Sequence, residues 1–107
     1  MKSAACRSML FVTLLFALLP AALAAATLDG KSVDERWYEG RAVNDDLGGY
    51  HCQMKFHGDH VFIRLIEAGL DVVGVLDDEA ISDPHEIVVH DPKRGCDWTL
   101  DCYDLGR

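Results

Sequence analysis

The sequence predicts an α+β fold, with one short N-terminal helix packed on an antiparallel meander of about five strands. If that sheet curls closed, the fold becomes a small barrel with one helix. Three observations support the prediction: a hairpin with cleanly sorted faces, further alternating strands joined by short turns, and one helix-initiation signal. Short connections favour antiparallel pairing, because parallel strands need crossovers of about a dozen residues or more.

Residues 1–26 are predicted to be a cleaved secretory signal peptide. Lys2 and Arg7 make its start positive, Met9–Leu19 is an almost unbroken apolar run, and small-residue cleavage motifs end at Ala24 and Ala26. The apolar run is too short for a comfortable membrane span, which needs about 20 residues. We therefore expect a periplasmic or secreted protein with no membrane span after cleavage.

Residues 27–107 are predicted to form a single small, acidic, β-rich domain. Without Lys2 and Arg7, eight basic residues remain against 18 acidic ones, a balance of −10 with histidine neutral. This charge argues against nucleic acid and anionic lipid as partners and permits a cationic protein. A domain of about 80 residues has a thin core, and exported domains of this size often add a disulfide.

The helix is predicted from Val33 to about Glu39. Ser32 and Glu35 have the spacing of a capping box, Trp37 lies one turn after the first residue, and Gly40 is placed to end the helix. We expect Trp37 to pack on the sheet rather than stack on a ligand. In the stretch that follows, Ala42-Val43 reads as a short edge strand before a turn.

Tyr50–Glu67 is predicted to form one β-hairpin whose turn is Gly58-Asp59. A glycine at the first central position of a two-residue loop suits a type II′ turn. One face then holds only apolar or aromatic side chains: Tyr50, Cys52, Met54, Phe56, Val61, Ile63 and Leu65. The other face pairs His57 with His60, Lys55 with Phe62, Gln53 with Arg64 and His51 with Ile66. A slip of one residue would mix the two faces.

Three further strands are predicted after the hairpin. Leu70–Leu76 is an interior strand with a bulge or a close backbone contact at Gly74. Glu86–Asp91 and Cys96–Tyr103 alternate in polarity and are joined by a turn that contains proline and glycine.

Three cysteines remain after cleavage, and a Cys52–Cys102 disulfide is predicted. Cys96 and Cys102 are six residues apart in one strand, which is roughly 20 Å and beyond a disulfide's Cα reach of about 4.4–6.8 Å. Cys52 must then be the shared partner, which requires the sheet to close or its last strand to lie beside the first. A Cys52–Cys96 bond stays open as an alternative, and the third thiol is left over.

The candidate binding residues lie on the outward face of the hairpin. Phe62 between Lys55 and Arg64 is the kind of mixed patch that binds another protein. The alternative is that the N-terminal helix covers this face and that Phe62 belongs to the core.

The same face carries His51, His57 and His60, which are candidate ligands for zinc or copper. No Cys-x-x-Cys or haem motif occurs, and no other cofactor is implied. The sequence places no pair of carboxylates in a pocket, no nucleophile beside a base and no phosphate loop. We therefore expect a protein that is not an enzyme.

Tyr50-His51-Cys52 at the start of a strand resembles bacterial lysozyme inhibitors, which have a Tyr-x-Cys near the start of a disulfide-pinned barrel. The resemblance covers those residues and the general size, and the Ser-Gly-x-x-Tyr loop of such inhibitors is absent. It implies an inhibitor of a basic hydrolase. The sequence as a whole predicts an exported binding protein that inhibits or neutralises a basic protein, with a periplasmic metal-binding protein as the alternative.

Overall fold

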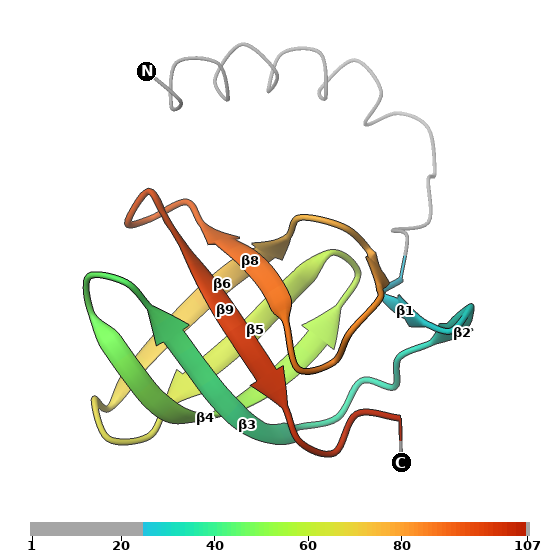
Figure 1. Ribbon diagram of the computed structural model, residues 1–107, viewed down its shortest axis with the longest axis horizontal. Coiled ribbons are helices and arrows are strands. Elements are labelled where there is room, and N and C mark those ends of the chain that lie inside the picture. The colour runs from blue at the N-terminus through green and yellow to red at the C-terminus, as the bar shows by residue number, and fades with distance from the viewer. Residues whose placement is uncertain (1–24, 107) are drawn as a thin grey trace, which may run out of the picture.

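The computed structural model describes residues 25–106, which form a closed barrel of antiparallel strands (Figure 1). Around the barrel the strands follow the order β3-β4-β5-β6-β8-β9, and β9 returns to pair with β3. Their bounds are β3 (Tyr38–Asn44), β4 (Gly48–His57), β5 (His60–Leu65), β6 (Leu70–Leu76), β8 (Ile87–Asp91) and β9 (Cys96–Cys102). Residues 1–24, which carry most of the predicted signal peptide, lie outside the described residues.

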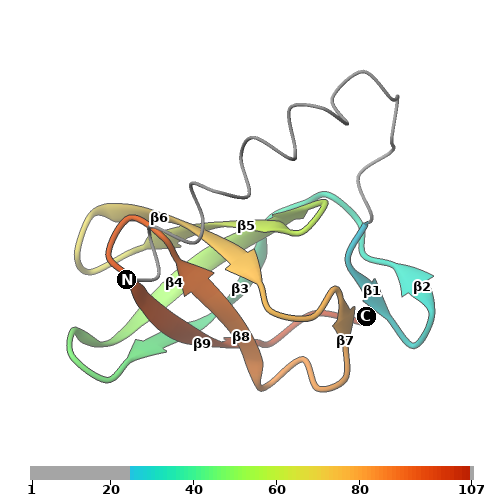
Figure 2. The same ribbon diagram turned by 90° about the horizontal axis from the view of Figure 1, so that it is seen from above.

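A smaller sheet lies beside one end of the barrel (Figure 2). Its strands, in the order β2-β1-β7, are β2 (Lys31–Ser32), β1 (Thr27–Leu28) and β7 (Ala80–Ile81). Ala26 and Ile81 from this region are buried together with the barrel core, so this sheet covers that end of it. Cleavage after Ala24, one of the two predicted points, would keep the buried Ala26 in the mature chain, whereas cleavage after Ala26 would remove it.

The predicted helix at 33–39 is wrong, and with it the α+β class, because residues 25–106 contain no helix. In the same range, no helix has the length and apolarity that a membrane span needs. The capping-box residues serve other purposes: Ser32 lies in β2, and the Glu35 carboxylate reaches the His57 ring at 2.6 Å. Gly40 does not end a helix but lies in the middle of β3.

β3 also replaces the short edge strand predicted at Ala42-Val43. It is a full member of the barrel that pairs with β4 on one side and with β9 on the other. Its buried positions alternate strictly with exposed ones, and they are Tyr38, Gly40, Ala42 and Asn44. This is the period of a strand, and pairing with two neighbours stabilises it over the local helix signal.

The hairpin prediction is confirmed for the ladder from Cys52–Leu65 to His57–His60, while the predicted pair His51–Ile66 lies beyond it and is joined only by the Ile66 N–H donating to the His51 carbonyl oxygen at 2.9 Å. The register pairs His57 with His60, Lys55 with Phe62 and Gln53 with Arg64. Gly58 has a positive φ of 60°, as the first central residue of a type II′ turn requires. The inward side chains from Cys52 to Phe56 and from Val61 to Leu65 are buried in the core.

The later strands also keep the predicted faces, and their contacts are close. A Cβ at Gly74 would lie 2.7 Å from Val89 Cγ2, so the predicted backbone approach at this glycine is confirmed. The β8–β9 turn is held by Asp91, whose buried carboxylate accepts hydrogen bonds from Trp98 Nε1 at 3.1 Å and from the Arg94 side chain at 3.1 Å. Burial alone would raise the pKa of Asp91, but these hydrogen bonds outweigh it and lower that pKa.

The substitution Gly40→Ala tests how tightly β3 is packed. A Cβ at this position would overlap the Asp101 carbonyl oxygen and lie 2.6 Å from Met54 Cε, so the barrel wall must move. We expect a loss of about 2–3 kcal/mol in the free energy of unfolding, measured by urea denaturation.

Gly49→Ala is the matched control, because the new Cβ would meet only the flexible end of the Arg41 side chain. It should change the free energy of unfolding by less than about 1 kcal/mol. Equal stability of the two variants would show that the close approach at Gly40 is not a packing constraint.

Candidate binding surface

The outward face of β4, β5 and β6 carries two rows of side chains set by the strand register. Lys55, Phe62 and Val73 form one row, since Phe62 pairs with Lys55 on β4 and with Val73 on β6. Gln53, Arg64 and Asp71 form the next row in the same way. Phe62 is 38% exposed and Val73 45% exposed, so the first row leaves apolar surface in contact with solvent.

Trp37 lies over these rows and turns them into a groove. The Arg64 guanidinium carbon is 4.1 Å from the centroid of the Trp37 ring, and Lys55 Nζ is 5.5 Å from it. Each cation over an aromatic face contributes about 0.5–1 kcal/mol at an exposed site. The groove encloses about 280 Å³ and is lined by Trp37, Phe62, Ile63, Arg64, Asp71, Val72 and Val73. We call it the Phe62 groove.

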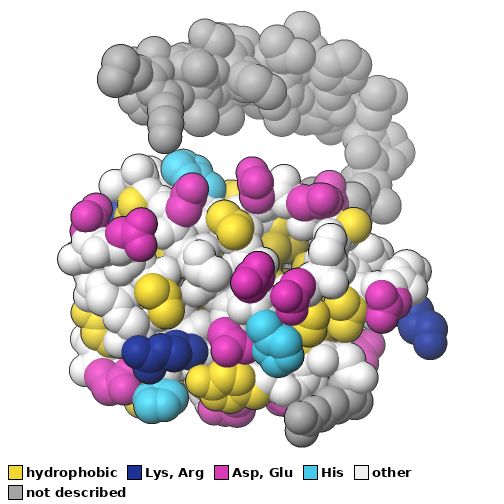
Figure 3. Space-filling model, in the orientation of Figure 1, with side chains coloured by type: hydrophobic (Ala, Val, Ile, Leu, Met, Phe, Trp, Pro, Cys, Tyr) yellow, Lys and Arg dark blue, Asp and Glu magenta, His cyan; other side chains and the backbone are white. Residues whose placement is uncertain are grey.

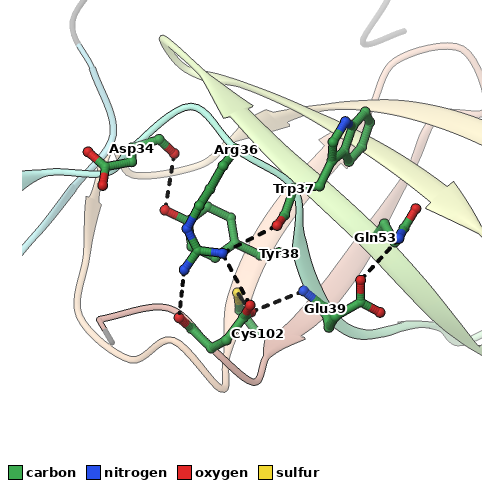
Figure 4. A network of polar contacts seen from close by, with 8 residues as sticks. Asp34, Arg36, Trp37, Tyr38, Glu39, Gln53 and Cys102 are labelled. Atoms are coloured by element: carbon green, nitrogen blue, oxygen red, sulfur yellow. Dashed lines mark hydrogen bonds and ion pairs between the residues drawn. The ribbon is translucent and has the colours of Figure 1, made fainter.

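A clamp to the end of the chain fixes the position of Trp37. The Arg36 guanidinium donates to the Asp104 carboxylate and to the Asp104 carbonyl oxygen, both at 3.2 Å, and the Glu39 N–H donates to the same carboxylate at 3.0 Å. Arg36 also stacks 3.8 Å from the centroid of the Tyr38 ring. Figure 4 shows the Trp37 ring pointing away from this network. The clamp therefore holds Arg36 on one side of the chain and leaves Trp37 directed to the other.

Of the predicted binding residues, Phe62 and Arg64 line the groove, and Lys55 lies beside it as the register partner of Phe62. The alternative of a covering helix falls, because residues 25–106 contain none. Five residues that line the groove were not among the predicted binding residues: Trp37, Ile63, Asp71, Val72 and Val73. Trp37 was placed on a helix, although the alternation that begins at Tyr38 already indicated a strand, and Val73 joins the row only through the β5–β6 register.

The three predicted metal ligands do not converge. His57 and His60 are register partners at the hairpin turn, but His51 lies six residues along β4, which is roughly 20 Å in an extended strand. No group of three or more potential ligands that could hold a metal ion occurs within residues 25–106.

Each of these histidine rings contacts a carboxylate. His51 Nδ1 lies 2.8 Å from Glu67 and His57 Nδ1 lies 2.6 Å from Glu35. The hydrogen bond from His51 lowers the pKa of Glu67. His60 Nδ1 lies 2.7 Å from the Asp59 carboxylate. The hydrogen bond to Glu35 favours a ring proton on Nδ1 of His57 and leaves its Nε2 to accept a ligand, whereas Asp59 Oδ1 makes no hydrogen bond with His60.

The predicted disulfide between Cys52 and Cys102 is not formed, since Cys52, Cys96 and Cys102 are free thiols in the structure. The barrel closes as that bond required, but β3 lies between the two strands: Gly40 pairs with Cys52 on one side and with Cys102 on the other. Two strand spacings are about 10 Å, which exceeds the Cα reach of a disulfide. The alternative Cys52–Cys96 bond is not formed either.

Acidic side chains are spread over much of the opposite wall. Figure 3 shows this side of the molecule, where β3, β9 and β8 face the viewer. The Phe62 groove, with Lys55 and Arg64 at its sides, therefore differs in charge from the wall that Figure 3 shows.

Comparisons with protein-family models, curated proteins and solved structures give no significant match. The resemblance to lysozyme inhibitors therefore stays confined to residues 50–52 and to the size of the domain.

The buried thiols should resist alkylation while the protein is folded. Burial raises the pKa of Cys52 to about 12 and that of Cys102 to about 11. Because the thiolate is the reactive form, less than about one thiol in a thousand is reactive at pH 8. Iodoacetamide followed by peptide mapping should modify the half-buried Cys96 and leave Cys52 and Cys102 unmodified.

The same treatment in denaturant without reductant should modify all three cysteines. If Cys52 and Cys102 stay unmodified there and react only after reduction, the two are bonded in the isolated protein and their description as thiols is wrong.

Proposed function

We propose that the protein is an exported, non-enzymatic binding protein that contacts another protein through the Phe62 groove. The observation that carries the proposal is the row of Phe62 and Val73 beside Trp37, where apolar area and two cations lie on one exposed face. Aromatic side chains and arginine are enriched at protein interfaces, and a hollow beside them gives an anchor residue a place to bind.

The charge of the chain favours a basic partner. The full sequence has a formal net charge of −8, and its first 26 residues contribute only positive charge. Such a field raises the rate of encounter with a cationic protein and repels anionic surfaces. Inhibition or neutralisation of a basic protein, such as a hydrolase or a toxin, is the activity that this combination supports best.

Phe62→Asp should abolish partner binding. The substitution removes the aromatic anchor and puts a charged group that must lose its hydration into the contact, and we expect binding at least about tenfold weaker. Quantitative capture of periplasmic or secreted proteins on immobilised variants, read by mass spectrometry, measures the loss.

Val43→Asp is the matched control, because Val43 is similarly exposed, at 42%, but lies on β3 away from the groove. It should recover the same proteins as the wild type. Identical capture by the Phe62→Asp variant would contradict the proposal.

A second candidate function is metal binding at the hairpin turn. It is favoured by the register pairing of His57 and His60 and by the carboxylate beside each Nδ1, which is the outer arrangement of many metal-bound histidines. Only two imidazoles meet there, so any zinc or copper site would need ligands from solvent or from a partner.

Titration calorimetry with zinc and with copper distinguishes this candidate. Binding that disappears in His57→Ala and persists in His51→Ala would support a site at the turn, since His51 lies at the far end of the hairpin. The absence of heat above the buffer control at micromolar metal would rule it out.

A further inference from the structure

The pairing between β6 and β8, which we call the seam, closes the barrel with very few backbone contacts. β6 pairs with β5 through six register pairs, from His60–Val75 to Leu65–Leu70. On its other side, β6 pairs with β8 only through Val75–His90 and Leu76–Val89. Residues 70–74 of β6 therefore extend beyond the strand that should cover their edge.

The direction of each backbone group on β6 follows from two hydrogen bonds. The Leu76 N–H donates to the Asp59 carbonyl oxygen on the β5 side, and the Asp77 N–H donates to the Val88 carbonyl oxygen on the β8 side. Because the direction alternates along a strand, the N–H and C=O groups of Val73 and Asp71 also point to the β8 side.

Pro92 explains why the seam ends where it does. Continuing the ladder from Val75–His90 places Val73 opposite Pro92, which has no N–H to donate. The turn closed by the Gly95 N–H and the Asp91 carbonyl oxygen, 2.8 Å apart, then directs the chain into β9. Within residues 25–106, no strand pairs with Val73 or Asp71 on this side.

The side chains of Val73 and Asp71 along this edge are also exposed to solvent. Val73 points outward at the border of the Phe62 groove. Asp71 pairs in register with Arg64, yet the guanidinium lies over the Trp37 ring, and no ion pair joins Asp71 to Arg64 among the described residues. The edge thus presents an exposed apolar side chain and, two residues away, a carboxylate that makes no ion pair within residues 25–106.

We propose that residues 71–73 of β6 accept an extended segment of the partner as an additional strand. The segment places an apolar side chain beside Val73 and a basic one beside Asp71, so that Lys55, Phe62, Val73 and the bound residue form one continuous row. This is strand addition at an exposed sheet edge, where the main chain supplies affinity and the alternating side chains supply specificity. The inference rests on the proposed binding function and names how that partner is recognised.

A basic segment is favoured over a second copy of this chain. Two copies would bring together bodies that each carry a formal charge of −8, whereas a basic residue beside Asp71 pairs with a free carboxylate. A stable dimer in sedimentation velocity without peptide, lost in Val73→Pro, would overturn the choice of occupant.

The test uses a labelled peptide that alternates threonine on one face with lysine and valine on the other. Its binding is measured by fluorescence anisotropy, and residue-resolved amide hydrogen exchange of the protein reports the contact. We expect saturable binding and slower exchange at Asp71 and Val73, without the same change at Val72, whose N–H points to β5. No saturable binding, or unchanged exchange at Asp71 and Val73, would overturn the proposal.

Two N-methylated versions of the peptide serve as the matched chemical control. One is methylated at the odd backbone nitrogens and the other at the even ones. Only one set of N–H groups faces β6, so one version should bind like the parent and the other at least about fivefold more weakly. Equal binding of both versions would show that the contact does not involve the main chain.

Protein variants then separate this inference from the proposed function. Val73→Pro removes the N–H that faces the seam and keeps the β5–β6 ladder, and Val73→Thr keeps that N–H with a side chain of similar shape. We expect Val73→Pro to weaken peptide binding at least about fivefold and Val73→Thr to change it little. If Phe62→Asp abolishes partner capture but Val73→Pro binds the peptide normally, the groove stands and strand addition is wrong. If Phe62→Asp has no effect on capture, the proposed function itself fails.

Discussion

The structure depends on closure of the barrel between β6 and β8. Barrels avoid the exposed edges of open sheets by pairing the last strand with the first. In this barrel the last strand, β9, pairs with the first, β3, and the shortest pairing is the one between β6 and β8, which rests on two register pairs and on Gly74, whose missing side chain lets Val89 pack directly on the β6 backbone. A larger residue at Gly74 would separate the two strands, so this glycine permits closure and Pro92 limits its extent. The exposed part of β6 follows from the same constraint.

A second close approach, at Gly40, determines how closely β4 and β9 lie on the two sides of β3. β3 lies between them, and its glycine lets the Met54 side chain and the Asp101 backbone occupy the space that a Cβ would need. The same register places Cys52 and Cys102 on either side of Gly40, buried and in the core. Close packing around Gly40, rather than a covalent bond, therefore holds this part of the wall, since the two thiols are separated by a whole strand.

Predictions that depend on residues close together in the sequence were accurate, whereas those that depend on residues far apart in the chain were not. The hairpin from Tyr50 to Leu65 could be predicted because its turn and its alternation are local, and parity alone put Phe62, Lys55 and Arg64 on one face. The helix prediction failed because Ser32 and Glu35 match a local signal, whereas β3 is stabilised by β9, far along the chain. Trp37 could not be assigned to the groove for the same reason. Its position depends on a clamp between Arg36 and Asp104, 68 positions apart.

The local charges near the groove differ from the field of the whole protein, and the two act over different ranges. The net negative charge attracts cations over a distance of about 8 Å at physiological ionic strength, beyond which salt screens it. At short range the Trp37 ring sets the charge pattern of this surface, because Arg64 stacks on it rather than pairing with its cross-strand neighbour Asp71. An Arg64–Asp71 pair would neutralise the edge and leave only apolar surface. With Arg64 stacked on Trp37 instead, the groove has cations on one side and an unpaired carboxylate at the open strand, so the proposed segment would have both its direction and its register set by charge.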